Sequence, residues 1–332
     1  MSTDMGIGLL LAVDGGNAKT DLAIVAPEGT VLAFVRGPGS SPHEHGIDGA
    51  LDRIEALLLE AGLDGPAAHA ELLLAGVDFP AEVEAVQRRA LERGWASRVE
   101  VANDTFAVLR AGTDRGWGVA IVCGAGMNCL GVSPDGRHVR FPALGPITGD
   151  WGGGQDVGAA AVWAAARSQD GRGPTTSLER AVPEHFGLVT PLQLAEAVHV
   201  GEISQRRFVE LAPLVLAEAP TDHVAAEIVA RQAREVVAFV RVALQRIGPV
   251  DEPADVVLGG GLMQARDPRL LDLIEAGLAE LDIPHSLGVV DAPPVVGAAL
   301  RALDVVGAEP SAHERLRGAL AADERLAEVP LG

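Results

Sequence analysis

The chain has 332 residues, of which 48% are hydrophobic and 22% charged, as in a globular protein with one large or two ordinary domains. Its formal net charge of −20 would repel a polyphosphate backbone, so we expect no nucleic-acid partner. Two cysteines are too few for a disulfide scaffold or a four-cysteine metal site.

The N-terminal segment, residues 1–8, lacks the basic stretch and the apolar core of a signal peptide. No run of the chain approaches the ~18 apolar residues that a membrane span needs. We therefore expect a cytoplasmic protein that has no membrane partner.

In the first part of the chain, short apolar runs are separated by turn residues. The predicted elements are strands at Leu9–Val13, Thr20–Ala26 and Val31–Arg36, a loop at Gly37–Gly46, a helix at Leu51–Ala61, a strand at Glu71–Gly76, a helix at Ala81–Arg93, a strand at Arg98–Ala102 and a helix at Thr105–Ala111. Three strands joined by tight turns and followed by strand–helix alternation predict an α/β domain.

The second part begins in the same way. The predicted elements are strands at Gly118–Cys123, Cys129–Ser133 and His138–Phe141, a mostly helical region at Gly152–Gly248, a strand at Ala254–Leu258, a helix at Leu270–Glu280, a strand at His285–Val290, and helices at Val295–Val306 and Ala312–Leu326. The turns Pro27-Glu28-Gly29 and Pro134-Asp135-Gly136 occupy equivalent places, which indicates two related domains unless the turn chemistry matches by chance. We expect an N-terminal domain over residues 1–112 and a C-terminal domain over 113–309. The last helix, about 310–326, is expected to pack onto the first.

Three Gly-rich loops each follow a short apolar strand. They are Asp14–Lys19, Gly124–Asn128 and Gly259–Gly261. Glycine lets a phosphate group approach backbone N–H donors closely. None of the loops fits the full P-loop pattern, since Lys19-Thr20 follows Ala18 and not a glycine, and the first loop precedes a strand, not the helix of a dinucleotide-binding motif. One such loop would suit an ordinary turn, whereas three at strand ends indicate phosphate binding.

The order of these segments resembles a known superfamily. Val13–Asp21, Val122–Cys129 and Val256–Gly261 look like the first phosphate loop, the second phosphate loop and the adenosine loop of the actin/Hsp70/sugar-kinase superfamily. Within it, the chain is similar to the N-acetylglucosamine kinase and BadF/BadG/BcrA/BcrD ATPase family, whose Gly-Asp-Glu-Gly segment resembles Gly149–Gly154. The resemblance implies an α/β fold with two actin/hexokinase-like (ribonuclease H-like) domains around a nucleotide cleft.

The resemblance also implies ATP and Mg²⁺ as cofactors and assigns residues to them. The phosphate-binding residues would be Gly15, Gly16, Asn17, Lys19, Thr20, Gly124, Ala125, Gly126 and Asn128, the adenosine-binding residues Gly259, Gly260 and Gly261, and the metal-binding residue Asp14. Phosphoryl transfer relies mainly on positioning and charge neutralisation, which backbone donors and a metal ion supply. Lys19 would touch phosphate or remain a solvated hairpin residue.

Two aspartates at helix starts have competing interpretations. By resemblance, Asp104 is the general base that accepts the proton of a sugar hydroxyl, and Asp150 contacts sugar hydroxyls. The alternative is that each is an N-cap, Asp104 for the helix from Thr105 and Asp150 for the helix from Gly154.

The expected sugar-binding residues are Ser41, Asn103, Asp104, Leu144 and Asp150. Three positions depart from the family pattern, since Ser41 replaces an Asn, Ala125 a Thr and Leu144 a Trp. A changed hydroxyl or ring alters which polar groups a pocket can satisfy. The kinase prediction is therefore stronger than the choice of sugar.

The predicted function is ATP-dependent phosphorylation of an amino sugar such as N-acetylglucosamine, with the 6-hydroxyl as the expected acceptor. A small-molecule sugar substrate and a homodimer are expected. One alternative is a redox-activating ATPase, whose cysteine pair binds an iron–sulfur cluster. Cys123 and Cys129 flank a phosphate loop instead, and we interpret them as small buried residues. The other alternative is a non-catalytic sugar sensor.

Overall fold

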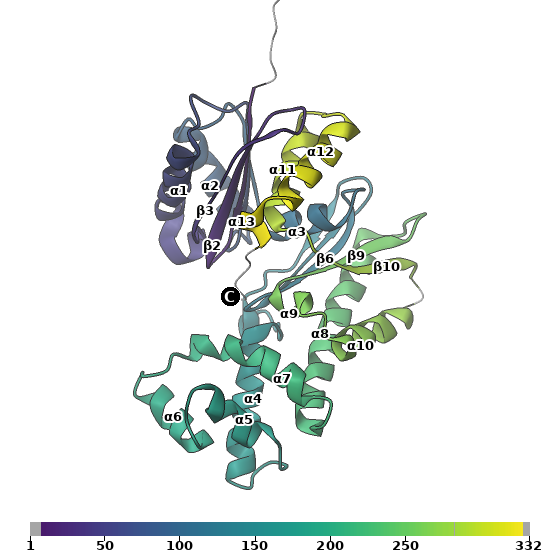
Figure 1. Ribbon diagram of the computed structural model, residues 1–332. Coiled ribbons are helices and arrows are strands. Elements are labelled where there is room, and N and C mark those ends of the chain that lie inside the picture. The colour runs from purple at the N-terminus through teal and green to yellow at the C-terminus, as the bar shows by residue number, and fades with distance from the viewer. Residues whose placement is uncertain (1–7, 282, 328–332) are drawn as a thin grey trace, which may run out of the picture. The chain divides into compact units, whose positions relative to one another are not determined.

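The computed structural model describes residues 8–281 and 283–327 (Figure 1). Residues 1–7, for which we predicted no signal peptide, lie outside the described residues. The described chain forms two compact units, one made of the residues up to 118 and from 290 onward, the other of residues 119–289. Among the described helices, none combines the length and hydropathy that crossing a bilayer requires.

The first unit is built on a five-stranded mixed sheet of order β3-β2-β1-β4-β5. Its strands are β1 (Leu10–Gly15), β2 (Lys19–Val25), β3 (Val31–Pro38), β4 (His69–Leu74) and β5 (Val99–Ala102). β2 pairs antiparallel with both β1 and β3, whereas β1, β4 and β5 are parallel. The carboxyl ends of β1, β4 and β5 therefore meet at one edge of the sheet.

Helices cover both faces of this sheet, as Figure 1 shows. They are α1 (Pro42–Ala61), α2 (Pro80–Glu92), α3 (Thr105–Gly112), α11 (Pro294–Val305), α12 (Pro310–Ala321) and α13 (Glu324–Ala327). Alternate residues of a strand point to opposite faces. Leu11 and Val13 of β1 accordingly join a core with α1 and α2, and Leu10 and Ala12 join a second core with α3, α11 and α12.

Three features of this unit differ from the sequence-based prediction. The loop expected at Gly37–Gly46 contains the start of α1, because Pro42 at the first helical position favours helix and Ser41 before it is extended. The last helix is interrupted after Ala321, so that α12 and α13 are separate. Helix α11, which we had assigned to the C-terminal domain, packs on β1 of the first unit because its apolar side completes the second core.

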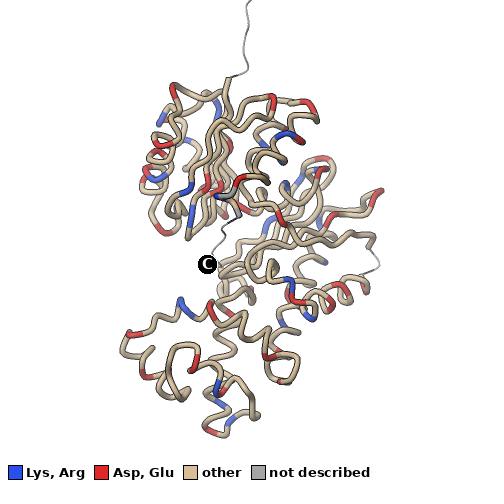
Figure 2. Tube along the Cα trace, viewed as in Figure 1, with Lys and Arg blue, Asp and Glu red and all other residues tan. Residues whose placement is uncertain are grey.

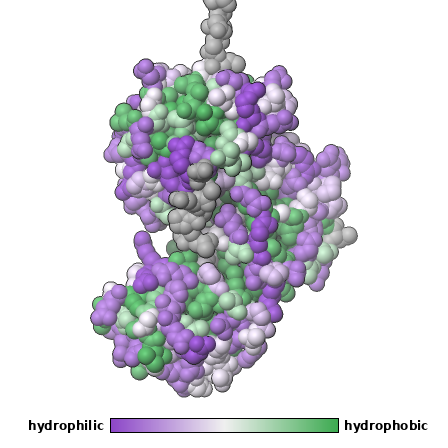
Figure 3. Space-filling model, viewed as in Figure 1, coloured by the Kyte–Doolittle hydropathy of each residue, from purple (hydrophilic) through white to green (hydrophobic). Residues whose placement is uncertain are grey.

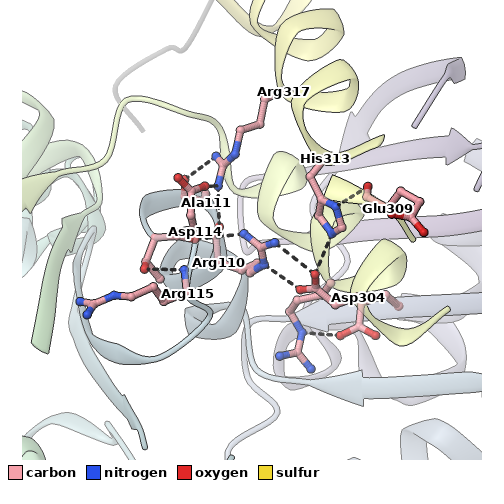
Figure 4. A network of polar contacts seen from close by, with 11 residues as sticks. Arg110, Ala111, Asp114, Arg115, Asp304, Glu309, His313 and Arg317 are labelled. Carbon is pink, nitrogen blue, oxygen red and sulfur yellow. Dashed lines mark hydrogen bonds and ion pairs between the residues drawn. The ribbon is translucent and has the colours of Figure 1, made fainter. Parts of the chain in front are cut away.

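A network of polar contacts fastens the C-terminal helices to α3 (Figure 4). The guanidinium of Arg110 on α3 binds both carboxylate oxygens of Asp304 on α11, at 2.7 and 3.1 Å. His313 of α12 contacts the same carboxylate at 2.8 Å, and Arg317 donates to the carbonyl oxygen of Ala111 at 2.9 Å. The C-terminal end of α3 is thereby joined to two helices about 200 residues away in sequence.

Acidic and basic residues are interspersed along the chain in both units (Figure 2). On the first unit, Arg89 of α2 and Arg93, which follows α2, pair with Asp48, Asp52 and Glu55 of α1 at 2.6 to 2.7 Å. Exposed pairs of this kind contribute about 0.2–1 kcal/mol each, so they adjust the packing of α2 on α1 and do not determine it.

The second unit is built on a sheet of order β10-β9-β6-β7-β8. Its strands are β6 (Gly118–Cys123), β7 (Met127–Val132), β8 (His138–Arg140), β9 (Ala254–Gly259) and β10 (His285–Val289). Numbered from its own first strand, each sheet has the order 3-2-1-4-5, which explains the repeated turn chemistry in the sequence. Two mixed sheets with flanking helices confirm the predicted α/β class.

The region between β8 and β9 is helical, as predicted. The helices of the second unit are η1 (Gly145–Ile147), α4 (Gly154–Gln169), α5 (Leu178–His185), α6 (Pro191–His199), η2 (Gln205–Leu211), α7 (Ala212–Glu218), α8 (His223–Ile247), α9 (Gly261–Gln264) and α10 (Pro268–Ala279). The 25-residue helix α8 packs against α10, α4 and β7, and its N-terminus is capped by the Asp222 carboxylate.

Candidate functional site

The first Gly-rich loop connects β1 to β2 at the sheet edge where the parallel strands end. The N–H of Gly16 donates to Lys19 O at 2.9 Å, and the N–H of Ser40 donates to Gly16 O at 3.1 Å. A Cβ on Gly15 would lie 2.5 Å from both Leu74 Cδ2 and Ser40 Oγ, so a larger residue there would displace these side chains. Asn17 at the tip is exposed. The loop is thus a fixed backbone whose tip is open to solvent.

Two predicted phosphate-binding side chains support this loop or its neighbours. Thr20 is fully buried, and its hydroxyl lies 2.9 Å from Pro38 O and 2.8 Å from Ser40 Oγ. Lys19 is partly exposed, and its Nζ lies 3.2 Å from a carboxylate oxygen of Asp21. In this structure the two side chains therefore contact protein groups of the β1–β3 region.

Asp14, the predicted metal-binding residue, is an unusually placed carboxylate. It is 8% exposed at the end of β1. Burial raises its pKa well above the usual range, and the nearby carboxylates of Asp104 and Asp21 raise it further, while Lys19 and Arg36 lower it. Within the described residues, both of those cations are paired with the Asp21 carboxylate instead. A divalent cation would relieve the unfavourable charge of Asp14, so the residue fits Mg²⁺.

The hydrogen bonds at the start of α3 test whether Asp104 is an N-cap. Asn103 is 1% exposed, and its Oδ1 accepts hydrogen bonds from the backbone N–H of Thr105 at 3.0 Å and from its hydroxyl at 2.7 Å. Asp104 has helical dihedrals and makes no capping hydrogen bond. The N-cap interpretation of Asp104 is therefore wrong, since Asn103 caps α3. The half-buried Asp104 carboxylate is close enough to Asp14 to raise its pKa.

Sequence analysis missed Asp78, which follows β4 as Asp104 follows β5. Its Oδ1 accepts a hydrogen bond from Asn103 Nδ2 at 3.1 Å. Its backbone N–H donates to Glu82 Oε2 at 2.8 Å. The available signal was an aspartate in the short segment between a buried parallel strand and the following helix, where ligand-binding side chains of α/β sheets often lie.

Ser41, a predicted sugar contact, carries a buried hydroxyl that the protein does not satisfy. The residue is fully buried before α1, and among the described residues its Oγ has no hydrogen-bond partner. A Cβ on Gly76 would lie only 2.8 Å from this oxygen, which places the hydroxyl beside the end of β4. An unsatisfied buried hydroxyl costs about 1–3 kcal/mol, so a polar ligand group at this point would be stabilising.

In the second unit, the loop between β6 and β7 packs on the N-terminus of α4. The N–H groups of Gly154 and Gln155 donate to the carbonyls of Gly124 and Ala125 at 2.8 and 2.9 Å. Ala125 is exposed, as is Gly126. Asn128 lies inside β7, and its Oδ1 accepts a hydrogen bond from the N–H of Cys129 at 2.8 Å. The N-terminus of α4 carries a positive helix dipole, which favours anions near the loop.

The third loop lies beside the second because β9 and β6 are adjacent and parallel. Gly259 ends β9, and Gly261 begins the short helix α9, which the sequence had indicated only as a loop. Gly260 has a φ of 86°, and a Cβ there would lie 2.4 Å from the backbone carbon of Cys123. Only glycine allows this approach, which holds the two loops together at one sheet edge.

Gln232 on α8 is a second residue that sequence analysis missed. It is 1% exposed, and its Oε1 accepts a hydrogen bond from the N–H of Gly153 at 2.9 Å. Its Nε2 lies 3.7 Å from Cys123 Sγ and 3.5 Å from Met127 Sδ. It therefore joins the start of α4 to the strands on both sides of the second loop. A polar residue on the buried side of a long helix was its only signal.

The segment before α4 contains the remaining predicted sugar contacts. The backbone N–H of Leu144 donates to Thr148 Oγ1 at 2.9 Å, and the Thr148 hydroxyl donates to the carboxylate of Asp150. Helix α4 begins after Gly153 without a side-chain cap. The N-cap interpretation of Asp150 is therefore wrong, and its half-buried carboxylate belongs to a short loop network.

Both cysteines lie next to the second loop and are buried. Burial raises the pKa of Cys123 and of Cys129. Thiolates are the form that binds iron–sulfur clusters, and these sulfur atoms are held as neutral thiols.

Comparisons with known proteins place this geometry in a family. The model of the BadF/BadG/BcrA/BcrD ATPase family matches residues 11–302. The chain is 24% identical over 265 residues to the N-acetylmuramic acid/N-acetylglucosamine kinase of Clostridium acetobutylicum, covering 76% of this chain and 85% of that protein. It is 26% identical over 313 residues to the N-acetyl-D-glucosamine kinase of Dictyostelium discoideum, covering 89% and 98%.

A solved structure has the same fold over almost its entire length. It is a protein of Chromobacterium violaceum provisionally named an N-acetylglucosamine kinase. The TM-score is 0.70 and the identity 27%, with 90% of this chain and 99% of that chain covered.

Proposed function

The chain belongs to the BadF/BadG/BcrA/BcrD ATPase family, and on that premise we propose that it is an ATP-dependent kinase of an amino sugar such as N-acetylglucosamine. The observation that carries the proposal is the edge of the first sheet where the parallel strands β1, β4 and β5 end: Asp14 lies near the end of β1, and Asp78 and Asp104 lie in the segments that follow β4 and β5. The names of the two curated relatives support the sugar class.

Asp104 would act as the general base of the reaction. It lies in the segment that follows β5, beside Asp14, and the cap of α3 comes from Asn103 and not from Asp104. It would accept the proton of the sugar hydroxyl, which we take to be the 6-hydroxyl, while that oxygen attacks the γ-phosphorus in line with the leaving ADP.

The phosphates of ATP would be bound by backbone N–H groups of the first and second loops. Gly15, Gly16 and Asn17 belong to the first loop, where the Gly16 N–H already donates to Lys19 O and would shape the turn, and Gly124, Ala125 and Gly126 belong to the second. Lys19, Thr20 and Asn128 would mainly keep these loops in shape through the contacts described above. Gly259, Gly260 and Gly261 would pack against the adenosine. Preorganised backbone donors need no rearrangement at the moment of transfer.

Asp14 would hold Mg²⁺, directly or through water. When bound, the ion would neutralise phosphate charge. The support is the buried, unfavourably charged carboxylate of Asp14, whose neighbouring cations are paired with Asp21. The carboxylate of Asp14, near the end of β1, would supply the oxygen ligand.

The sugar would be bound by Ser41, Asn103, Asp104, Leu144 and Asp150. Ser41 offers the buried unsatisfied hydroxyl, and Asp150 offers a carboxylate held by Thr148. Leu144 would provide apolar contact where the family pattern has an aromatic ring. A substrate hydroxyl or amide that met Ser41 would remove a standing energetic cost, which gives the site a means of selecting its sugar.

Two other functions have less support. A redox-activating ATPase needs accessible thiolates, and both thiols here are buried with raised pKa values. A non-catalytic sugar sensor would not need the Asp104 carboxylate at the sheet edge.

We further propose that the protein is a homodimer, the commonest assembly of soluble oligomers. Hydrophobic residues reach the surface of the helical part of the second unit (Figure 3). On α4, Trp163 is 63% exposed and lines a groove of about 590 Å³. The molar mass from light scattering during gel filtration tests this directly: a value near 34 kDa would contradict a dimer.

The kinase proposal is tested by ADP release with a panel of sugars: N-acetylglucosamine, glucosamine, N-acetylmannosamine, N-acetylmuramic acid and glucose. We expect turnover with at least one N-acetylated sugar, loss of about 10²-fold or more in kcat for Asp104→Asn, and an NMR spectrum of the product with phosphate on O6. Turnover of no sugar in the panel would favour the sensor. Stoichiometric iron and sulfide in anaerobically purified protein would favour the activator.

A further inference from the structure

Asp78 joins two strand–helix junctions of the first unit. Its carboxylate oxygen Oδ1 accepts a hydrogen bond from Asn103 Nδ2 at 3.1 Å, across 25 residues of sequence. β4 and β5 are neighbouring parallel strands, so the segments that follow them lie side by side. The hydrogen bond therefore connects the β4–α2 junction to the β5–α3 junction.

The backbone of Asp78 is itself held in place. Glu82 in the first turn of α2 accepts hydrogen bonds from the N–H groups of Asp78 and Phe79, at 2.8 and 2.9 Å. Pro80, the first residue of α2, has a restricted φ and no N–H group. The half-buried carboxylate of Asp78 thus extends from a backbone fixed by the capped end of a helix.

The Asp78 carboxylate determines how the Asn103 amide is oriented. Asn103 Oδ1 accepts from the N–H and the hydroxyl of Thr105, so the amide oxygen faces α3. The amide nitrogen then faces Asp78. A flipped amide would place its NH₂ against the Thr105 N–H donor and its oxygen against a carboxylate, and both arrangements are repulsive. Only one orientation satisfies both neighbours, and it fixes the first turn of α3.

We propose that Asp78 is a positioning residue for phosphoryl transfer, which holds Asp104 in place through Asn103. The inference rests on the proposed role of Asp104 as general base. Asp104 is the residue between Asn103 and Thr105, so a change in the Asn103 contact moves the backbone from which its carboxylate extends. Misplacing a reacting group by about 1 Å can lower the rate about 10²-fold. Loss of the Asp78–Asn103 hydrogen bond is therefore expected to lower the rate of phosphoryl transfer measurably.

Two substitutions at Asp78 separate positioning from a direct effect of its charge. Asp78→Ala removes the acceptor for Asn103, and kcat should fall about 10-fold or more with the KM for ATP nearly unchanged. Asp78→Asn removes the charge but retains an oxygen that can accept from Asn103, and it should restore most of kcat. The matched control is Thr190→Ala, which removes the cap of α6 in the second unit and should cost stability without lowering kcat.

A readout independent of activity comes from the side-chain amide of Asn103 in nitrogen-15 NMR spectra, identified by its loss in Asn103→Asp. The signal should shift in Asp78→Ala, stay nearly unchanged in Asp78→Asn and be unaffected in Thr190→Ala. An unmoved signal in Asp78→Ala, or an Asp78→Asn variant as slow as Asp78→Ala, would overturn the positioning role. Full activity of Asp104→Asn would instead contradict the proposed role of Asp104 as general base, on which the inference rests. An inactive Asp104→Asn with an unimpaired Asp78→Ala would overturn the inference alone.

Discussion

Asp14 on β1 lies directly opposite Asp21 on β2 in the antiparallel register of the first hairpin. Both carboxylates are buried, and like charges in such a pair are destabilising. The two carboxylates differ in their ion pairs, because Arg36 and Lys19 both pair with Asp21. The charge of Asp21 is offset by these two cations, whereas the charge of Asp14 has no such ion pair among the described residues. The hairpin therefore keeps one carboxylate ready for a cation.

Asp14→Asn should weaken the binding of Mg²⁺-ATP yet stabilise the protein in the absence of metal and nucleotide. Folding raises the pKa of Asp14, so the cost to native stability is complete above that raised pKa, declines as the pH falls toward the ordinary carboxyl value of 3.8, and vanishes below it. Denaturant titration with a chelator should show a more stable variant at pH 8, with the difference shrinking toward pH 4. A variant less stable than wild type at pH 8 would contradict the charge argument.

Arg36→Met should destabilise the first unit by about 3 kcal/mol, because it leaves the fully buried Asp21 with Lys19 as its remaining cation. The matched control is Arg89→Met, which breaks an exposed pair with Asp48 and should cost about 0.5 kcal/mol. The measurement is the free energy of unfolding in urea. An equal decrease in the free energy of unfolding of the two variants would show that the burial of Asp21 does not make its ion pair more important for stability.

Gly260→Ala should impair both stability and nucleotide binding. The added Cβ would meet the backbone of Cys123 at 2.4 Å and also force a side chain onto a φ of 86°. Gly136→Ala isolates the second effect, since Gly136 has a φ of 83° with open space around it. We expect about 1 kcal/mol for Gly136→Ala and about 2 kcal/mol more for Gly260→Ala. ATP affinity, measured by calorimetry, should fall only in Gly260→Ala.

Ser41→Ala should be neutral or slightly stabilising without sugar, because it removes a buried hydroxyl that has no partner among the described residues. If Ser41 contacts the sugar, the variant should raise the KM for the preferred sugar about 5-fold or more and leave the KM for ATP unchanged. Thermal unfolding and steady-state kinetics provide the two measurements. A loss of stability above about 1 kcal/mol would show that the hydroxyl is satisfied within the protein.

Much of the fold could be predicted because its signals are local. Alternating and continuous apolar runs predicted all ten strands of the described chain to within a few residues, and Gly-rich and Pro-containing turns marked their connections. The three loops could also be found, since glycine after a buried strand is a local pattern. The start of α1 was missed because residues 42–50 combine Pro, His and Gly, which favour a loop until Ala50 packs against the sheet.

The sequence by itself determined the order of strands and loops and the acidic and glycine residues at the strand ends, because these depend on neighbours along the chain. Only the tertiary structure decided that Asn103 caps α3, that Asp78 orients Asn103, that Gln232 supports the second loop and that α11 belongs to the first unit. Each of these outcomes except the cap depends on a contact between distant segments. The cap depends on which of two adjacent side chains faces the helix, and that is set by how β5 and α3 pack.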